Sequence, residues 1–141
     1  MIDPDTGNIH LTEPMAEITP HLSLSQLKRA SWARSAEALL KVPGHGHWKL
    51  RAVCSGADFI VVLHFKGEQL TGASLMLELV KKESTWADWS EQAELQRKDF
   101  HDAWLVQGLG QQREFHWGKV ESVFHPQSGA SKILVSYALV D

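Results

Sequence analysis

Cysteine is almost absent from this chain of 141 residues, which contains only Cys54. A single thiol cannot form an internal disulfide, and this suits a reducing compartment. The first residues lack the positively charged region and the apolar stretch that make up a signal peptide. No window approaches the roughly 18 consecutive apolar residues of a transmembrane helix. We therefore expect a cytoplasmic protein with no membrane partner.

Long basic runs are lacking as well. The 14 lysines and arginines are scattered, and the formal net charge is -3. Because proteins that bind nucleic-acid phosphates usually present a basic face, we expect no nucleic-acid partner. The chain also lacks a Gly-x-Ser-x-Gly elbow, a glycine-rich phosphate loop, a Cys-x-x-Cys pair and a His-Glu-x-x-His motif. We expect no catalytic residue, no cofactor and no bound metal.

The chain does have the length and apolar content of one folded domain. Hydrophobic residues make up 43% of it and charged residues 22%, both ordinary for a globular protein. A chain of this size can bury a sizeable core without disulfides or metals. We predict a single α+β domain over residues 1–141, with a mainly antiparallel sheet of five or six strands packed against two helices.

The amino-terminal part predicts a turn and then a capped helix. Residues 3–8 read Asp-Pro-Asp-Thr-Gly-Asn, a composition typical of a turn. Ser23 and Gln26 have the spacing of a capping box, so the first helix should begin near Leu24. Residues 30–40 are compatible with its continuation, and Pro43 would end it.

Three strands and a second helix are predicted in the middle of the chain. Residues 48–53 alternate between apolar and basic, which indicates a half-buried strand. Residues 59–66 are almost wholly apolar, which predicts a central strand buried on both faces. Residues 70–80 complete an antiparallel meander.

The second helix should start at a cap formed by Ser84 or Thr85 and end near Gly108 and Gly110. Aromatic residues recur along it at spacings of three or four residues and should face the core. These residues are Trp86, Trp89, Phe100 and Trp104.

A closing β-hairpin is the clearest pattern in the chain. Two β-rich runs, residues 114–124 and 130–137, flank a His-Pro-Gln-Ser-Gly turn. The alternation changes phase at Gly118, and a β-bulge there would restore it. The bulge would keep Phe115, Trp117, Val120 and Phe124 on one buried face.

The chain resembles a group of small bacterial cytoplasmic proteins that are encoded near toxin or secretion genes. Some of them are regarded as immunity proteins. Turn and core residues at both ends of the chain carry the resemblance: Asp3, Thr6, Gly7, Ile9, Phe115, Trp117, Gly118, Val120, Ser122 and Phe124. It implies an α+β fold and a cognate toxin as partner, but it points to no site residue.

A protein–protein binding module is accordingly the leading functional hypothesis, with an immunity protein as its most concrete form. The predicted contact surface is the acidic side of the second helix, with two loops as lesser candidates. The helix residues are Asp88, Glu91, Glu94, Asp99 and Asp102, and the loop residues are His45, His47, His125, Gln127 and Ser128. An acidic surface would favour a basic partner.

Two alternatives remain. A small hydrolase or metal-dependent enzyme would need several histidines to meet in one cleft, because a zinc site takes three or four ligands. The candidates are His45, His47, His101, His116 and His125, with His64 on the central strand as a further member. A homodimeric structural protein joined through an open sheet edge is the other alternative.

Overall fold

The computed structural model describes residues 1–39, 44–78, 91–125 and 130–138, without the side chains of residues 91, 92 and 125. In these residues the protein is α+β, with an antiparallel sheet of seven strands, a separate sheet of two strands and two α-helices. The predicted fold class is confirmed, but the predicted number of strands is too low. Two of the seven strands, β3 (Glu37–Ala38) and β7 (Glu114–Phe115), are edge strands of two residues each. Strands of two residues are too short to show the alternation of apolar and polar residues from which strands are predicted.

The large sheet has the strand order β3-β4-β5-β6-β9-β8-β7, and every neighbouring pair is antiparallel. Its long strands are β4 (His45–Cys54), β5 (Ala57–Lys66), β6 (Gln69–Leu77), β8 (Gly118–His125) and β9 (Ala130–Tyr137). The small sheet is a hairpin of β1 (Ile9–Thr12) and β2 (Met15–Ile18). The helices are α1 (Leu24–Arg29) and α2 (Glu91–Leu109), with a 3-10 turn, η1, at Ser31–Ala33.

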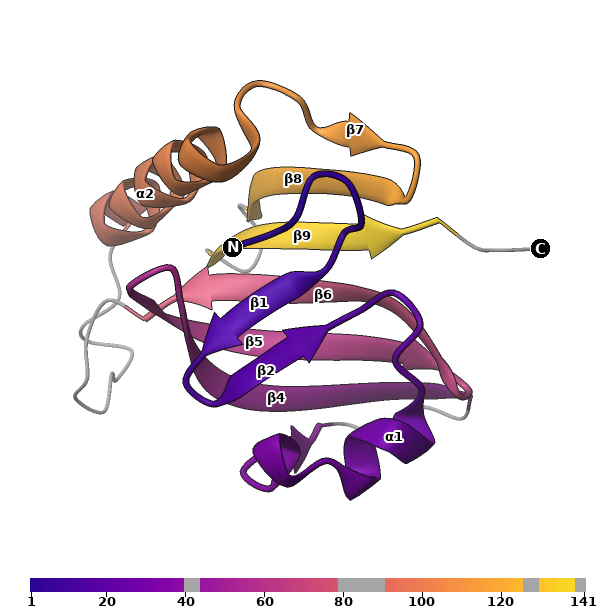
Figure 1. Cartoon of the computed structure of the whole chain (residues 1–141). Coiled ribbons are helices and arrows are strands. Elements are labelled where there is room, and N and C mark those ends of the chain that lie inside the picture. Colours follow the sequence, from indigo (N-terminus) through magenta and orange to yellow (C-terminus); the bar gives the residue numbers. More distant parts are fainter. Residues whose placement is uncertain (40–43, 79–90, 126–129, 139–141) are drawn as a thin grey trace.

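The core lies between the large sheet and the β1–β2 hairpin, which crosses in front of β4, β5 and β6 (Figure 1). On β5 the residues Phe59, Val61, Leu63 and Phe65 are buried on this side. The intervening residues, such as Val62, are only partly buried. The prediction that this strand is buried on both faces is therefore wrong, because the hairpin covers only one face.

The capping box at the start of α1 is confirmed. The Gln26 amide donates to Ser23 Oγ at 3.1 Å, and the Ser23 amide donates to Gln26 Oε1 at 2.9 Å. The helix ends at Arg29, well before Pro43. The chain then forms the 3-10 turn and the edge strand β3, so the helix-compatible composition of residues 30–40 does not make a longer helix.

Helix α2 lies where two neighbouring strands of the large sheet separate. Strands β6 and β9 pair from Gly72 and Ser136 as far as Leu75 and Ile133, and no further. Figure 1 shows α2 beside the end of the sheet at which this separation occurs. Among the described residues, no helix combines the length and the apolar character needed to cross a bilayer.

The helix supplies hydrogen-bond partners that the separated strands no longer give each other. The Leu77 amide donates to His101 Nε2 at 3.0 Å, and Arg97 Nε donates to the Leu77 carbonyl at 2.9 Å. On β9 the Ser131 amide donates to Glu94 Oε2 at 3.1 Å. The face of α2 that meets the sheet is consequently part polar, since Glu94 and His101 are buried.

The predicted aromatic core stripe on this helix is only partly right. Trp104 is buried, whereas Phe100 is 39% exposed. Trp86, Trp89 and the predicted caps at Ser84 and Thr85 lie outside the described residues.

The closing hairpin is confirmed as β8 and β9, paired from Gly118–Tyr137 to His125–Ala130. The predicted bulge at Gly118 is wrong. His116 and Trp117 form a tight turn between β7 and β8, and Gly118 pairs with Phe115 directly after it. The change of phase in the apolar alternation is therefore explained by that turn. Glycine is required at position 118 because a Cβ there would lie 2.0 Å from the Ser136 carbonyl oxygen.

Candidate functional site

One face of the large sheet carries apolar residues although no described helix or strand lies across it. Outward positions of an antiparallel sheet are usually polar when that face meets water. Here Ile60 and Val62 of β5, Met76 of β6 and Leu134 of β9 are partly buried outward residues. The register places Ile60 opposite Met76, so the apolar positions adjoin across the strands. Contiguous exposed apolar surface of this kind often marks a binding site.

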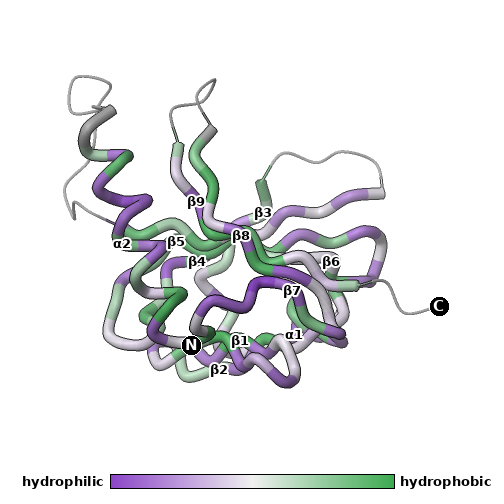
Figure 2. The backbone as a smooth tube through the Cα atoms, turned by 90° about the horizontal axis from the view of Figure 1, so that it is seen from above, coloured by the Kyte–Doolittle hydropathy of each residue, from purple (hydrophilic) through white to green (hydrophobic). Residues whose placement is uncertain are grey.

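A groove of about 400 Å³ lies on this face, which we call the sheet groove. Its apolar lining consists of Leu39, Ile60, Val62 and Met76. Its polar lining consists of His47, Lys49, His64, Ser74 and Lys132. Figure 2 shows the ends of β3 and of the β8–β9 hairpin rising on the side of the sheet opposite β1 and β2. The groove therefore draws its lining from the edge region near β3 across to β9.

Two histidines and a serine form a hydrogen-bonded chain in the sheet groove. His47 and His64 are directly opposite each other on β4 and β5, and their Nδ1 atoms are 2.7 Å apart. His64 Nε2 lies 2.7 Å from Ser74 Oγ on β6. The two Nδ1 atoms can share only one proton, so one ring must donate and the other accept. The chain thus fixes the orientation of His64 from both sides.

Burial sets the charge state of this chain. Burial, the largest cause, together with the nearby His47 and Lys132 lowers the pKa of His64 to about 4. His64 is therefore neutral at pH 7. Among the residues that the structure describes, the ionisable side chains lining the groove are these two histidines and two lysines, Lys49 and Lys132, without a carboxylate.

A serine hydrogen-bonded to one histidine, which is oriented by a second, has the order of groups seen in nucleophilic catalysis. Two features argue against that use here. A histidine with a pKa near 4 is a weak general base at neutral pH. Ser74 also lies inside the sheet, paired with Val62 on one side and Leu134 on the other, so its backbone belongs to the strand ladder and is not free to stabilise an oxyanion. The arrangement is better suited to binding than to turnover.

The predicted acidic surface on α2 is only partly present. The prediction that Glu94 is a surface contact is wrong, because the residue is only 7% exposed. Its carboxylate accepts a hydrogen bond from the Ser131 amide and forms an ion pair with Arg97. Asp99 is exposed, as predicted, and Asp102 is partly exposed but paired with Lys98 at 3.0 Å. Asp88 and the side chain of Glu91 lie outside the described residues.

The histidines proposed for an enzyme do not gather in the part of the chain that is described. His45 is exposed at the start of β4, His101 is buried on the side of α2 that faces β6, and His116 is exposed in the turn between β7 and β8. Two of the candidates, His47 and His64, meet in the sheet groove. The side chain of His125 and all of Gln127 and Ser128 lie outside the described residues. Within the described residues, no group of three or more His, Cys, Asp or Glu could hold a metal ion.

The outer face of α2 is unexpectedly apolar. Leu95, Phe100 and Val106 are 46%, 39% and 43% exposed, and they are three of the five large hydrophobic residues exposed in the described chain. Leu95, Asp99 and Val106 are four and seven residues apart in turn, so they lie along one side of the helix. Phe100 lies roughly 120° around the helix from Leu95 and Val106, toward the other margin of its exposed surface. We call the set of Leu95, Asp99, Phe100 and Val106 the outer α2 face.

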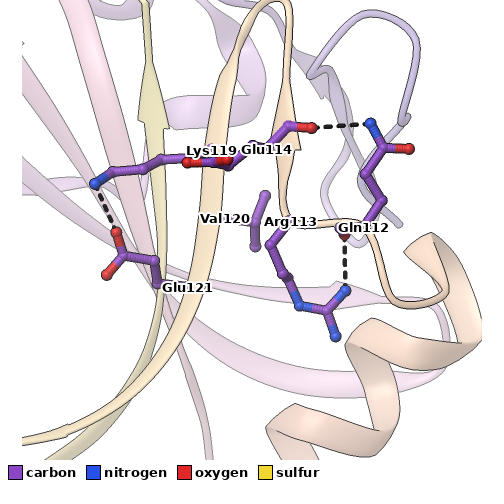
Figure 3. Close-up of a pocket in the computed structure, with 6 residues that line it drawn as sticks. All are labelled: Gln112, Arg113, Glu114, Lys119, Val120 and Glu121. Carbon is purple, nitrogen blue, oxygen red and sulfur yellow. Dashed lines mark hydrogen bonds and ion pairs between the residues drawn. The ribbon is translucent and has the colours of Figure 1, made fainter.

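A larger hollow of about 550 Å³ lies beside β7 and β8, but its polar groups already have partners (Figure 3). Lys119 pairs with Glu121 at 2.8 Å, and Gln112 donates to the Glu114 carbonyl at 2.8 Å. Arg113 donates to the backbone carbonyl of Gln112 at 2.8 Å. These internal contacts leave the hollow without a convergent set of groups for a ligand.

Comparison with known proteins adds no further constraint. No protein-family model, no curated protein and no solved structure matches this chain. The sheet groove and the outer α2 face are therefore the two features of the molecule that bear on its function.

Proposed function

We propose that this protein is a cytoplasmic binding module that occupies a partner protein without turnover, most concretely an immunity protein that neutralises a cognate toxin. The outer α2 face is the observation that carries the proposal. Covering the exposed side chains of Leu95 and Val106 with a partner would be favourable, because it removes apolar surface from water, and Phe100 extends the exposed apolar surface around the helix.

This face matches the general anatomy of protein interfaces in its large apolar side chains, whereas Asp99 lies between two of them and not at a rim. Large apolar side chains form the desolvated centre of an interface, and charged residues are commoner at its rim. Asp99, exposed between Leu95 and Val106, would favour a basic residue on the partner and accelerate association. The proposal therefore keeps the second helix as the contact element but replaces a uniformly acidic surface with an apolar one around Asp99.

The test uses the product of a toxin-like reading frame adjacent to the gene. We expect a stoichiometric complex and loss of toxicity on co-expression. Leu95→Asp and Val106→Asp should each weaken binding by at least about ten-fold, because each places a charge in the centre of the interface. Met15→Asp is the matched control, since Met15 is 89% exposed on β2. Unchanged affinity in both helix variants would refute the outer α2 face as the contact.

A hydrolase is the second candidate, and the Ser74–His64–His47 chain is the observation that favours it. The weak basicity of His64 predicts that the purified protein does not cleave an activated ester such as p-nitrophenyl butyrate above background. Turnover that is lost in Ser74→Ala but kept in Ser25→Ala, a serine on α1, would instead establish the enzyme.

Light scattering of the free protein tests the remaining alternative, a homodimer joined through a sheet edge. The described edge strands β3 and β7 are two residues long, and short edges offer few backbone groups for pairing. We expect a monomer that forms a one-to-one complex.

A further inference from the structure

The sheet groove has a charge pattern that the proposed protein–protein contact does not use. Its floor is formed by Ile60, Val62 and Met76, which come from the adjacent strands β5 and β6. Two lysines also line the groove, Lys49 from β4 and Lys132 from β9. The groove thus combines an apolar floor with two cations from separate strands.

Neither lysine is neutralised by a described carboxylate. No ion pair within 4.0 Å joins Lys49 or Lys132 to an acidic residue in the described part of the chain. Glu37 is opposite Lys49 in the sheet register but does not approach it to that distance and does not line the groove. The charge of Lys132 also reaches His64 inside the groove, where it contributes to the lowered pKa of that histidine. Within the described residues, the two lysines therefore have no carboxylate partner that would compete with a ligand.

We propose that the sheet groove binds a small amphipathic anion, with the apolar part of the ligand on Ile60, Val62 and Met76 and its carboxylate between Lys49 and Lys132. The volume of about 400 Å³ lies in the range of small-molecule sites, roughly 300–1,000 Å³. His47 and Ser74 add polar groups beside the lysines, as expected of a mostly apolar site with a few oriented polar groups. A medium-chain fatty acid or an aryl carboxylate has this chemistry.

Decanoate and its neutral analogue decanol are suitable probes for the full-length protein. Methyl resonances of Ile60, Val62 and Met76 in NMR spectra would report occupancy of the groove directly. We expect decanoate to shift these resonances and to bind more tightly than decanol, because only the carboxylate can pair with the lysines.

Two charge-neutralising variants make the test specific. Lys49→Gln and Lys132→Gln should each weaken decanoate binding by about ten-fold and leave decanol binding unchanged. Lys66→Gln is the matched control, because Lys66 is exposed at the end of β5 and does not line the groove. All three changes are at exposed or partly exposed positions, and thermal unfolding of each variant would confirm that it folds.

Three results with the unmodified protein would overturn the proposal. They are the absence of decanoate binding at millimolar concentration, equal binding of decanoate and decanol, and methyl shifts outside the groove. Loss of affinity in Lys66→Gln equal to that in Lys49→Gln would overturn it as well, since it would show a general charge effect. These outcomes are independent of the toxin-binding experiment, which tests the other surface.

Discussion

The Tyr137 hydroxyl donates a hydrogen bond to the Gly7 carbonyl at 2.9 Å and so joins two residues 130 positions apart. The bond ties the amino-terminal turn to the last strand of the sheet. Trp117 reinforces it, because its indole Nε1 donates to the Pro4 carbonyl at 2.9 Å. The two ends of the described chain are therefore held together by two aromatic side chains of the closing hairpin region.

Tyr137→Phe should lower the free energy of unfolding by about 1–2 kcal/mol, because it leaves the buried Gly7 carbonyl without this donor. Urea denaturation would measure the change. Tyr137 is the only tyrosine, and burial raises its pKa above the ordinary value. The phenolate absorbance should thus appear only as the protein unfolds in alkali. Ordinary titration of the folded protein would contradict the buried position.

Gly118→Ala should be among the most damaging single changes in the chain. A Cβ at this position would lie 2.0 Å from the Ser136 carbonyl oxygen, which is backbone and cannot rotate away. We expect a loss of more than about 3 kcal/mol or failure to fold. Gly56→Ala is the matched control, because Gly56 also has a positive φ, +78°, but has open space around it. That variant should cost only about 1 kcal/mol, the conformational cost alone.

The sequence predicted those parts of the fold that depend on local residue patterns. The capping box of Ser23 and Gln26 and the closing hairpin are both confirmed, since each is defined by residues near in sequence. Strand β5 shows where this reasoning failed. A continuous apolar run fits burial on both faces, but whether a second layer covers the outer face is decided by distant segments.

The groove histidines could have been found from one local signal. Ser55 and Gly56 form a two-residue turn between β4 and β5, so that Cys54 is paired with Ala57. Both turn residues have a positive φ. A two-residue hairpin turn fixes the register of the whole ladder. Counting back from that turn places His47 opposite His64. The third member, Ser74, could not be found in this way, because a register shift near Phe65 displaces β6 by one residue.

Glu94→Gln tests whether Glu94 belongs to the buried contact between α2 and β9. Its carboxylate accepts from the Ser131 amide and pairs with Arg97, and both side chains of the pair are mostly buried. Breaking a buried ion pair leaves the partner charge uncompensated, and we expect a loss of about 3 kcal/mol in denaturant unfolding. Asp99→Asn, on the outer α2 face, should change stability by less than about 0.5 kcal/mol. Equal effects in the two variants would show that Glu94 is exposed after all.

The stability of the protein should fall as the pH drops from about 6.5 to about 4, and His101 is a principal cause. Its side chain is fully buried, and its Nε2 accepts from the Leu77 amide, which requires the neutral ring. Burial and the charge of Arg97 lower its pKa to about 4. Between the ordinary and the lowered pKa the unfolded chain binds a proton that the folded protein does not, so unfolding becomes more favourable as the pH falls.

This shift corresponds to a loss of up to about 3 kcal/mol for His101 over the whole window, at about 1.4 kcal/mol per pH unit. Above pH 6.5 the contribution is fully present, because both states are neutral. Urea midpoints measured between pH 4 and 7 would give the slope of stability against pH.

His101→Gln keeps an acceptor for the Leu77 amide but cannot titrate, so it should flatten this pH profile. His64→Gln should flatten the profile further, because the pKa of His64 is also lowered to about 4. His116→Gln, at an exposed turn position, should leave the profile unchanged. If His101→Gln keeps the full slope, the proton uptake on unfolding belongs to other groups and the neutral buried state of His101 is wrong.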